Sequence, residues 1–147
     1  MAPFIMLVGS LLLFRLAGYM GWTYFDDWTT SLRFAVALMF LLTAPAHWGK
    51  RQPDLIRMVP PAFPRPELLV TLTGWLEIIG AVGIVIPAVS PYAAGGLALL
   101  LAAMFPANVH AARNRLTLAG KPATPILPRT LLQLVFLAAV LLAGFMK

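Results

Sequence analysis

The third apolar stretch of the sequence, residues 68–87, reads LLVTLTGWLEIIGAVGIVIP. Its length matches the roughly 20 residues that an α-helix needs to cross about 30 Å of hydrocarbon. The stretch contains one ionisable residue, Glu77, and it ends at a proline, Pro87. It therefore predicts a transmembrane helix that carries a carboxyl group close to the middle of the bilayer.

Four further stretches of similar length and composition flank this one. Hydrophobic residues make up 61% of the 147 residues and charged residues 11%, whereas soluble domains average about 45–50% and about 25%. A soluble core of this size cannot bury so many apolar side chains. The sequence therefore predicts an all-α, integral membrane helical bundle that forms a single domain over residues 1–147. The expected spans are residues 3–22, 32–48, 68–87, 91–112 and 126–146.

The first span has an alternative interpretation as a cleaved signal peptide, which has a similar length. A signal peptide begins with a basic region, and residues 1–14 contain no Lys or Arg. We therefore expect a retained helix, so that the bundle has four core transmembrane helices and an extra N-terminal one.

The basic residues are concentrated in two loops. Four of the 11 lie in residues 49–67 and four in residues 113–130, and five alternating spans put both loops on one side of the membrane. Because basic loops stay in the cytoplasm, we expect an inner (cell) membrane protein with a cytoplasmic N-terminus and an external C-terminus. The basic residues then determine the orientation of the protein in the membrane. Nucleic acid is therefore not expected as a partner.

The two loops differ in character. Residues 49–67 contain five prolines, which exclude a long helix. Apolar residues such as Leu55 and Met58 stand among their charges, and this mixture predicts a short amphipathic turn at the level of the lipid headgroups. Residues 113–130, which contain three prolines, are expected to form a plain connection.

Glu77 is the strongest functional candidate, because an ionisable group at this depth costs several kcal/mol unless it is paired or hydrated. Helical spacing places Gly74, Gly80 and Ala81 on its face of the helix. Two interpretations stay open. The carboxyl group could line a cleft, where it would hold a proton or bind the polar end of a ligand, or it could be a structural partner of Arg15, an asparagine or a histidine.

Two histidines and one asparagine are the next candidates. His47 follows Pro45 at the end of the second span, where it could cap carbonyl groups or share a cavity with Glu77 as a proton donor–acceptor pair. Asn108 and His110 are about 200° apart on an ideal helix, so both cannot face one cleft without a kink. We expect Asn108 to point inward, and His110 to face the headgroups or the proline-rich loop.

Several kinds of chemistry have no support in the sequence. It has no cysteine, so disulfides and thiolate sites are excluded. The two histidines and Glu77 lack the local spacing of metal ligands, and no phosphate-binding glycine motif is present. No metal and no covalently bound cofactor are therefore expected. Arg15, deep in the first span, is expected to form an ion pair or to snorkel toward Asp26 and Asp27.

A series of short motifs runs along residues 32–147: Leu32-Arg33, Ala46-His47, Arg57-Met58-Val59-Pro60-Pro61 with Pro64 and Pro66, Thr73-Gly74, Leu76-Glu77, Gly80-Ala81 and Phe105-Pro106-Ala107-Asn108. Together these motifs resemble the DoxX-like family of small membrane proteins. The resemblance implies a compact helical bundle, usually of four spans. Some family members are small subunits of quinone-linked or thiosulfate-linked respiratory enzymes, and distant relatives are an assembly chaperone and a cargo receptor. The fold also looks similar to a sterol-isomerase bundle with acid and histidine side chains in a lipid-filled cavity.

Two functions are compatible with these features, and whether the protein is an enzyme stays open between them. In the first, Glu77, His47 and Asn108 contact the polar end of a quinone or isoprenoid-type lipid, with Arg15 and His110 as secondary polar candidates. The protein would then assist membrane redox or lipid chemistry, and an isomerase would use Glu77 and His47 as its proton donor and acceptor. In the second, the protein is a non-catalytic partner or assembly chaperone, whose membrane face and proline-rich loop contact another membrane protein. The expected loop-contact residues are Arg57, Met58, Pro60 and Pro61. The expected partners of the protein are membrane lipids, a membrane redox complex, a client membrane protein or a second copy of the chain.

Overall fold

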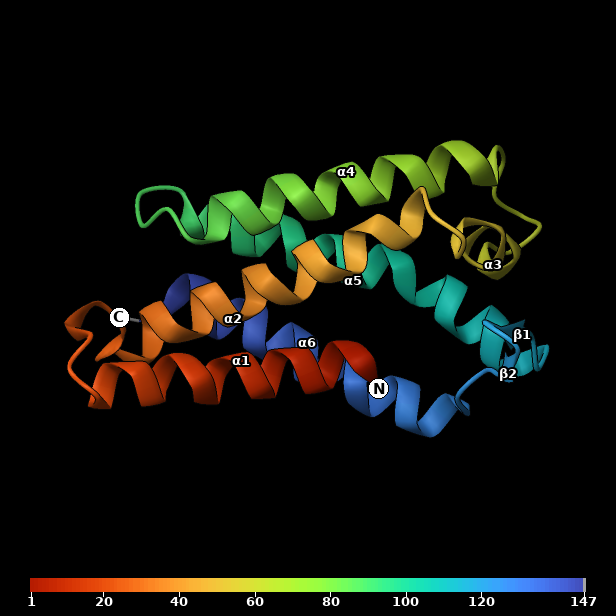
Figure 1. Cartoon of the computed structure of the whole chain (residues 1–147). Helices are drawn as coiled ribbons and strands as arrows, with labels where there is room; N and C mark the ends of the chain where they lie inside the picture. The colour runs from red at the N-terminus through yellow and green to blue at the C-terminus, as the bar shows by residue number, and fades with distance from the viewer. Residues whose placement is uncertain (147) are drawn as a thin grey trace.

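The structure, a computed structural model, describes residues 1–146. In this part of the chain there are six α-helices, two short 3-10 helices and one two-stranded antiparallel sheet (Figure 1). The elements are α1 (Ala2–Tyr19), η1 (Thr23–Phe25), α2 (Trp28–Thr43), η2 (Ala44–His47), α3 (Gln52–Met58), α4 (Pro66–Ile84), α5 (Ser90–Arg113), β1 (Thr117–Leu118), β2 (Lys121–Pro122) and α6 (Ile126–Phe145).

Five of the helices are long and apolar enough to cross a membrane: α1, α2 together with η2, α4, α5 and α6. The prediction of an all-α bundle is confirmed, and the five helices correspond one to one with the five expected spans. Large apolar side chains such as Leu13, Ile79 and Leu99 are exposed on the outer faces. Such a surface suits hydrocarbon as the surrounding solvent, and the chain is compatible with a multi-pass membrane protein.

Helix α2 lies at the centre of the bundle. It packs against α1, α4 and α6, and α5 packs against both α4 and α6. Figure 1 shows α1 and α4 on opposite sides of α2. The fully buried side chains at the centre come from four helices, with Val36 on α2, Ile84 on α4, Leu97 on α5 and Val140 on α6. These contacts hold α2 and α4 in the positions from which the polar residues of the site project.

The start of α2 differs from the expected boundary at residue 32, because the helix begins at Trp28. The Asp27 carboxylate accepts hydrogen bonds from the backbone N–H groups of Thr29 (3.2 Å) and Thr30 (2.8 Å). This N-cap supplies acceptors for N–H groups that have no partner within the helix. The polar residues before Leu32 therefore form a capped first turn.

Helix α2 itself ends at Thr43, and η2 continues the second span to His47, one residue before the expected end. The boundaries of the other spans shift by three residues or fewer. Helix α1 ends at Tyr19 instead of residue 22, because Gly21 has a φ of +108° that no helix can continue. Helix α4 runs from Pro66 to Ile84 instead of from 68 to 87, with the proline in its first turn. Helices α5 and α6 match the expected ranges 91–112 and 126–146 to within one residue.

The two basic loops contain more structure than a plain connection. The short helix α3 occupies the proline-rich loop, as its amphipathic pattern predicts. The expectation of a plain connection over residues 113–130 was wrong, because β1 and β2 form a hairpin there. Its two turn residues, Ala119 (φ +52°) and Gly120 (φ +76°), both have the positive φ that a tight hairpin turn requires. Helix α3 and the hairpin lie at the same end of the bundle in Figure 1.

Asp54 and Arg57 on α3 bind the hairpin. Arg57 forms an ion pair with Asp54 and donates from Nη2 to the carbonyl oxygen of Thr117 over 2.7 Å. Asp54 Oδ2 accepts a hydrogen bond from the N–H of Ala119 (2.9 Å), and this bond is the main reason why the pKa of Asp54 is lowered from 3.8. The two loops that the charge pattern places on one side of the membrane are therefore in direct contact.

Candidate functional site

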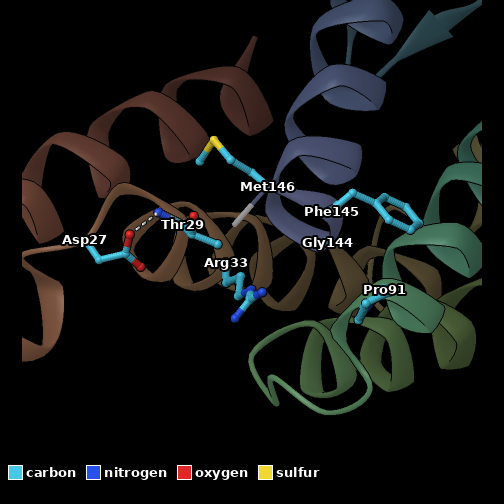
Figure 2. A pocket seen from close by; sticks show the side chains of 7 residues that line it. All are labelled: Asp27, Thr29, Arg33, Pro91, Gly144, Phe145 and Met146. Carbon is cyan, nitrogen blue, oxygen red and sulfur yellow. Dashed lines mark hydrogen bonds between the residues drawn. The ribbon is translucent and has the colours of Figure 1, made fainter.

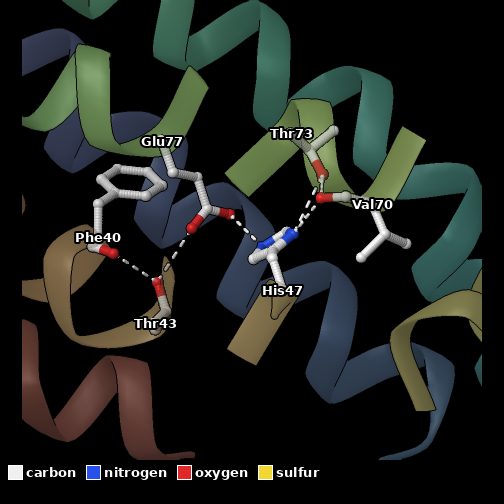
Figure 3. Close-up of polar contacts among 6 residues, drawn as sticks. All are labelled: Phe40, Thr43, His47, Val70, Thr73 and Glu77. Carbon is white, nitrogen blue, oxygen red and sulfur yellow. Dashed lines mark hydrogen bonds and ion pairs between the residues drawn. The ribbon is translucent and has the colours of Figure 1, made fainter. Parts of the chain in front are cut away.

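Glu77 and His47 meet inside the bundle. Glu77 projects from α4, eleven residues or about 16 Å after its first residue, and His47 is the last residue of η2. His47 Nε2 lies 3.2 Å from Glu77 Oε1, and each residue is only 4% exposed (Figure 3). Each of these two buried polar groups therefore has the other as a hydrogen-bonding partner in largely apolar surroundings.

The local sequence explains how His47 reaches this depth. Pro45 has no N–H group and cannot continue the hydrogen bonds of α2, and the chain leaves α2 through the tighter helix η2. On the opposite wall, Gly74 of α4 faces the imidazole directly: a Cβ atom at this position would lie 2.7 Å from His47 Cβ. The absence of a side chain at residue 74 therefore makes room for the ring.

The hydrogen bonds of His47 restrict where its protons lie. Nδ1 lies 2.6 Å from the carbonyl oxygen of Val70, and a carbonyl oxygen only accepts, so Nδ1 carries a hydrogen. One further proton must then lie between Nε2 and Glu77 Oε1. The pair is either an imidazolium with a carboxylate or a neutral imidazole with a carboxylic acid, and the transfer of one proton interconverts the two forms.

Two threonines extend this pair in both directions. Thr43 Oγ1 lies 3.3 Å from Glu77 Oε2 and 3.1 Å from the carbonyl oxygen of Phe40. On the other side, Thr73 Oγ1 lies 3.3 Å from His47 Nδ1 and donates to the Val70 carbonyl over 3.0 Å. Figure 3 shows the resulting continuous chain of polar contacts between α2, η2 and α4.

Glu77, His47 and Asn108 all line one cavity of about 550 Å³. The structure thus brings together the three residues that the sequence indicates as binding candidates, from η2, α4 and α5. The remaining wall is largely apolar and includes the first residues of α1. The wall also contains Met39, Phe40, Arg51, Met104, Thr124, Arg129, Leu132, Gln133 and Phe136.

Two residues of this cavity, Arg129 and Gln133, were missed by the sequence reasoning. Arg129 Nη1 donates to Asn108 Oδ1 over 2.8 Å, and Gln133 Nε2 donates to the carbonyl oxygen of Leu101, also over 2.8 Å. Arg129 was counted as a loop charge, although it lies in the first turn of α6. The spacing of four residues, which puts Arg129 and Gln133 on one helix face, was the available signal.

A second, smaller cavity of about 240 Å³ lies against the proline-rich loop. It shares His47 and Asn108 with the larger cavity, and two of the expected loop-contact residues, Met58 and Pro60, form part of its apolar wall. The other two lie outside it: Arg57 binds Asp54 and the hairpin, and Pro61 is exposed. His47 therefore borders both cavities.

The secondary candidates Arg15 and His110 do not line the larger cavity. Arg15 is buried at the turn between α1 and α2, where Nη1 donates to the carbonyl oxygen of Phe25 over 3.0 Å. Its guanidinium lies 4.7 Å from the ring centre of Tyr19 and 4.5 Å from that of Trp28. Arg15 thus extends toward the turn that carries Asp26 and Asp27, as one of its two predicted roles required, but within residues 1–146 it forms no ion pair with either. A carbonyl oxygen and two aromatic faces contact the cation, while its Nε has no hydrogen-bond partner.

His110 faces the proline-rich loop, one of the two positions left open for it. Its Nδ1 lies 3.1 Å from the carbonyl oxygen of Met58, at the end of α3, and donates to it. Over residues 1–146, no group of three or more His, Asp or Glu side chains is arranged to hold a metal ion. The polar residues that remain for a binding function are those around the larger cavity.

A third cavity, of about 410 Å³, lies at the other end of α2 (Figure 2). Both charged residues in its wall are engaged at helix ends: Asp27 caps the start of α2, and Arg33 Nε donates to the carbonyl oxygen of Ala143 over 2.8 Å. Because a cation at a helix C-terminus interacts favourably with the helix dipole, Arg33 has a structural role. The wall also contains Thr29, Pro91, Gly144, Phe145 and Met146.

Comparison with known proteins gives one family. A family model described as a domain of unknown function, DUF8561, matches residues 36–143, which is well over half of the chain. The chain belongs to the DUF8561 family. The part that matches DUF8561 contains Glu77, His47, Asn108, Arg129 and Gln133, and it leaves α1 outside. No curated protein and no solved structure matches the chain.

Proposed function

We propose that this DUF8561 protein binds a hydrophobic ligand inside the membrane, with the His47–Glu77 pair at a polar group of that ligand. The observation that supports this most strongly is the position of the pair, which lies in the wall of a cavity of about 550 Å³ among five apolar helices. Small-molecule sites have volumes of about 300–1,000 Å³ and combine apolar walls with a few convergent polar groups.

The chemistry of the wall favours a quinone or an isoprenoid-type lipid. Met39, Phe40, Met104 and Phe136 offer apolar and aromatic contacts, while a carbonyl or hydroxyl group on the ligand would bond to Glu77 or His47. Because the pair shares one proton, it can also donate a proton to such a group or accept one from it. The protein would act as an accessory to membrane redox chemistry, with the ligand or a partner protein as the electron carrier, or to lipid chemistry.

A relationship to the DoxX-like proteins is part of this proposal. The motif residues His47, Glu77 and Asn108 lie far apart in the sequence, yet they line the same cavity. The resemblance begins at about residue 32 and the DUF8561 match at residue 36, so both leave out α1. This agreement supports a common four-helix core to which α1 is added.

In the proposed orientation, α3 and the hairpin face the cytoplasm of a cell with an inner membrane. The contact between the two basic loops supports this arrangement, since both must then lie on one side. The natural sequence has no cysteine, so single cysteines report the topology cleanly. In intact cells, a membrane-impermeant maleimide should label Tyr24→Cys and not Lys121→Cys; the reverse pattern would contradict the orientation.

A second candidate function, a non-catalytic assembly partner, is favoured by one specific observation. The bonds from Thr43 to Glu77 and from His47 to Val70 connect α2 and η2 to α4, so the polar chain could serve only to hold helices together. Interhelical hydrogen bonds in membranes average about 0.6 kcal/mol. In this case the loss of the Glu77 carboxylate would lower stability slightly and leave ligand affinity unchanged.

Binding measurements on the purified, detergent-solubilised protein separate the two functions. The probes are decylubiquinone and farnesol, detected by native mass spectrometry. We expect Glu77→Gln to weaken the binding of at least one probe by about tenfold or more, since a charge-assisted or proton-sharing bond is lost. Glu67→Gln is the matched control, because Glu67 lies on the same helix and is exposed. Wild-type affinity in Glu77→Gln, together with a lower melting temperature, would favour the assembly partner.

A further inference from the structure

Two cations without an acidic partner border the larger cavity. Arg51 and Arg129 both line it, whereas the ion pairs found within residues 1–146 are His47–Glu77 and Arg57–Asp54. The one carboxyl group in the lining, Glu77, is bonded to His47. Asp54 on α3 is close enough for the charge of Arg51 to act on it, but Asp54 is paired with Arg57 and does not line the cavity. The wall itself therefore carries more positive than negative charge.

Arg129 is held in place from one side. Its Nη1 donates to Asn108 Oδ1 over 2.8 Å and its Nε to the carbonyl oxygen of Thr124 over 2.9 Å. Both acceptors are neutral, the residue is partly buried, and Nη2 makes no hydrogen bond to any described residue. A desolvated guanidinium is most stable opposite an anion, whose paired oxygens match its planar fork. The geometry leaves Nη2 available for such an anion.

The start of α6 adds to this positive field. Thr124 lies in the cavity wall, two residues before the first residue of the helix. No side chain caps this helix N-terminus. Pro128 has no N–H group and the N–H of Arg129 donates to the carbonyl oxygen of Pro125, so the N–H groups of Ile126 and Leu127 keep their capacity to donate. The positive end of the helix dipole and the guanidinium of Arg129 thus act in the same place, as in many anion sites at helix N-termini.

The other part of the cavity wall has the opposite character. Met39 and Phe40 on α2, Met104 on α5 and Leu132 and Phe136 on α6 line it. None of these side chains offers a hydrogen-bond donor or a charge. The lining is therefore amphipathic, since it combines cations with hydrocarbon side chains.

We propose that the ligand is an amphiphile with an anionic headgroup, a phosphate or a carboxylate, which binds between Arg51 and Arg129. Its hydrocarbon chain lies against the methionine and phenylalanine side chains of the cavity. This inference rests on the proposed function and narrows its ligand class, since a neutral quinone would leave both cations without an anion. The His47–Glu77 pair then contacts the ligand beyond its headgroup.

Probes that share one chain and differ in the headgroup test the proposal on the full-length protein in neutral detergent at low ionic strength. We compare farnesyl phosphate, farnesol and inorganic phosphate. Farnesyl phosphate should bind about tenfold or more tightly than farnesol, because charge-assisted bonds to two guanidinium groups are added. Inorganic phosphate should not displace farnesyl phosphate at equal concentration, because it lacks the chain.

Variants locate the headgroup. Arg129→Gln and Arg51→Gln should each weaken farnesyl phosphate binding by about tenfold and leave the affinity for farnesol unchanged. Arg51 is exposed and its side chain makes no hydrogen bond to a described residue, so Arg51→Gln tests the proposal even if Arg129→Gln fails to fold. Lys50→Gln is the control, since Lys50 is the exposed neighbour of Arg51 and does not line the cavity. It should bind both probes as the wild type does.

Three results would overturn the proposal, and they differ in what they leave standing. Equal wild-type affinity for farnesol and farnesyl phosphate, with both lost in Glu77→Gln, refutes the anionic headgroup and keeps the intramembrane pocket. Inorganic phosphate that competes as well as farnesyl phosphate assigns the cations to a soluble anion instead of a lipid. If neither farnesyl phosphate nor farnesol binds, and Glu77→Gln does not change the binding of decylubiquinone, the proposed function itself is refuted.

Discussion

Gly74 lies against His47 so closely that a side chain at this position has no space. A Cβ atom there would lie 2.7 Å from His47 Cβ and 2.8 Å from both His47 Cγ and Trp48 Cη2. Real Cβ atoms do not approach other heavy atoms so closely. The contact between α4 and η2 therefore sets the position of the imidazole, and with it the bonds to Val70 and Glu77.

We predict that Gly74→Ala displaces His47 and destabilises the protein by about 1–3 kcal/mol, the usual cost of an overpacked core. Thermal or denaturant unfolding in detergent measures this change. Gly95→Ala is the control, because nothing lies within 4 Å of the Cβ position in that helical glycine. It should be neutral or more stable by up to about 1 kcal/mol. Equal stabilities of Gly74→Ala and Gly95→Ala would show that the contact is loose.

The cap of α2 predicts a dependence of stability on pH. The hydroxyl and the backbone N–H of Thr30, together with the N–H of Thr29, donate to Asp27 and lower its pKa from 3.8. A carboxyl group whose pKa is lower in the folded state stabilises the fold above its unfolded value. This contribution is present above pH 3.8 and is lost as the pH falls through the lower folded value.

Replacement of the cap gives the corresponding test at neutral pH. Asp27→Ala should lower the free energy of unfolding by about 1 kcal/mol and remove this part of the acid sensitivity. Unfolding at pH 7 and under more acidic conditions measures both effects. Asp26→Ala, which removes an exposed carboxyl group without a side-chain hydrogen bond, should change neither. An acid sensitivity that persists unchanged in Asp27→Ala would contradict the assignment.

The hairpin turn predicts a stabilising substitution. Ala119 has a φ of +52° next to Gly120 at +76°, a pair of positive values for which Asn-Gly is preferred. Ala119→Asn should slow amide hydrogen exchange in residues 116–123, and its N–H should still donate to Asp54. Ala119→Val should speed exchange there, because a β-branched residue is strained at positive φ. The opposite order of exchange rates would refute this account of the turn.

Asp54 connects α3 to the hairpin, and its removal should release both. Asp54→Ala loses the bond from the N–H of Ala119 and the ion pair with Arg57, so exchange should accelerate in the hairpin and in α3. Asp54→Asn keeps an oxygen for the N–H and should give an intermediate rate. Unchanged exchange in Asp54→Ala would mean that apolar contacts alone hold α3 in place.

The fold could be predicted from the sequence because a membrane imposes its own length scale. An apolar stretch of about 20 residues between charged loops has one stable solution, a spanning helix. The boundaries were less predictable where single residues decide them. Asp27 moved the start of α2 toward the N-terminus through its cap, and Gly21 ended α1 through its backbone conformation.

The site was predictable only in part. The depth of Glu77 and the proline before His47 can be read from the sequence, but their 3.2 Å contact depends on how α2 and α4 pack. Arg129 was missed because its place in the first turn of α6 was not weighed against its role as a topology charge. Arg15 was assigned acidic partners because sequence spacing shows nearby carboxylates and does not show a carbonyl oxygen or the faces of aromatic rings.

Helix α1 lines the cavity at its first residues and lies outside the range that defines the family. The His47–Glu77 pair and the residues that support it thus lie within the segment that matches the family, whereas one part of the cavity wall comes from α1, which lies outside it. If the proposed ligand binds here, exchange of this single helix would reshape the space for its hydrocarbon tail and leave the His47–Glu77 pair intact. Tail preference and headgroup chemistry would then be able to evolve independently.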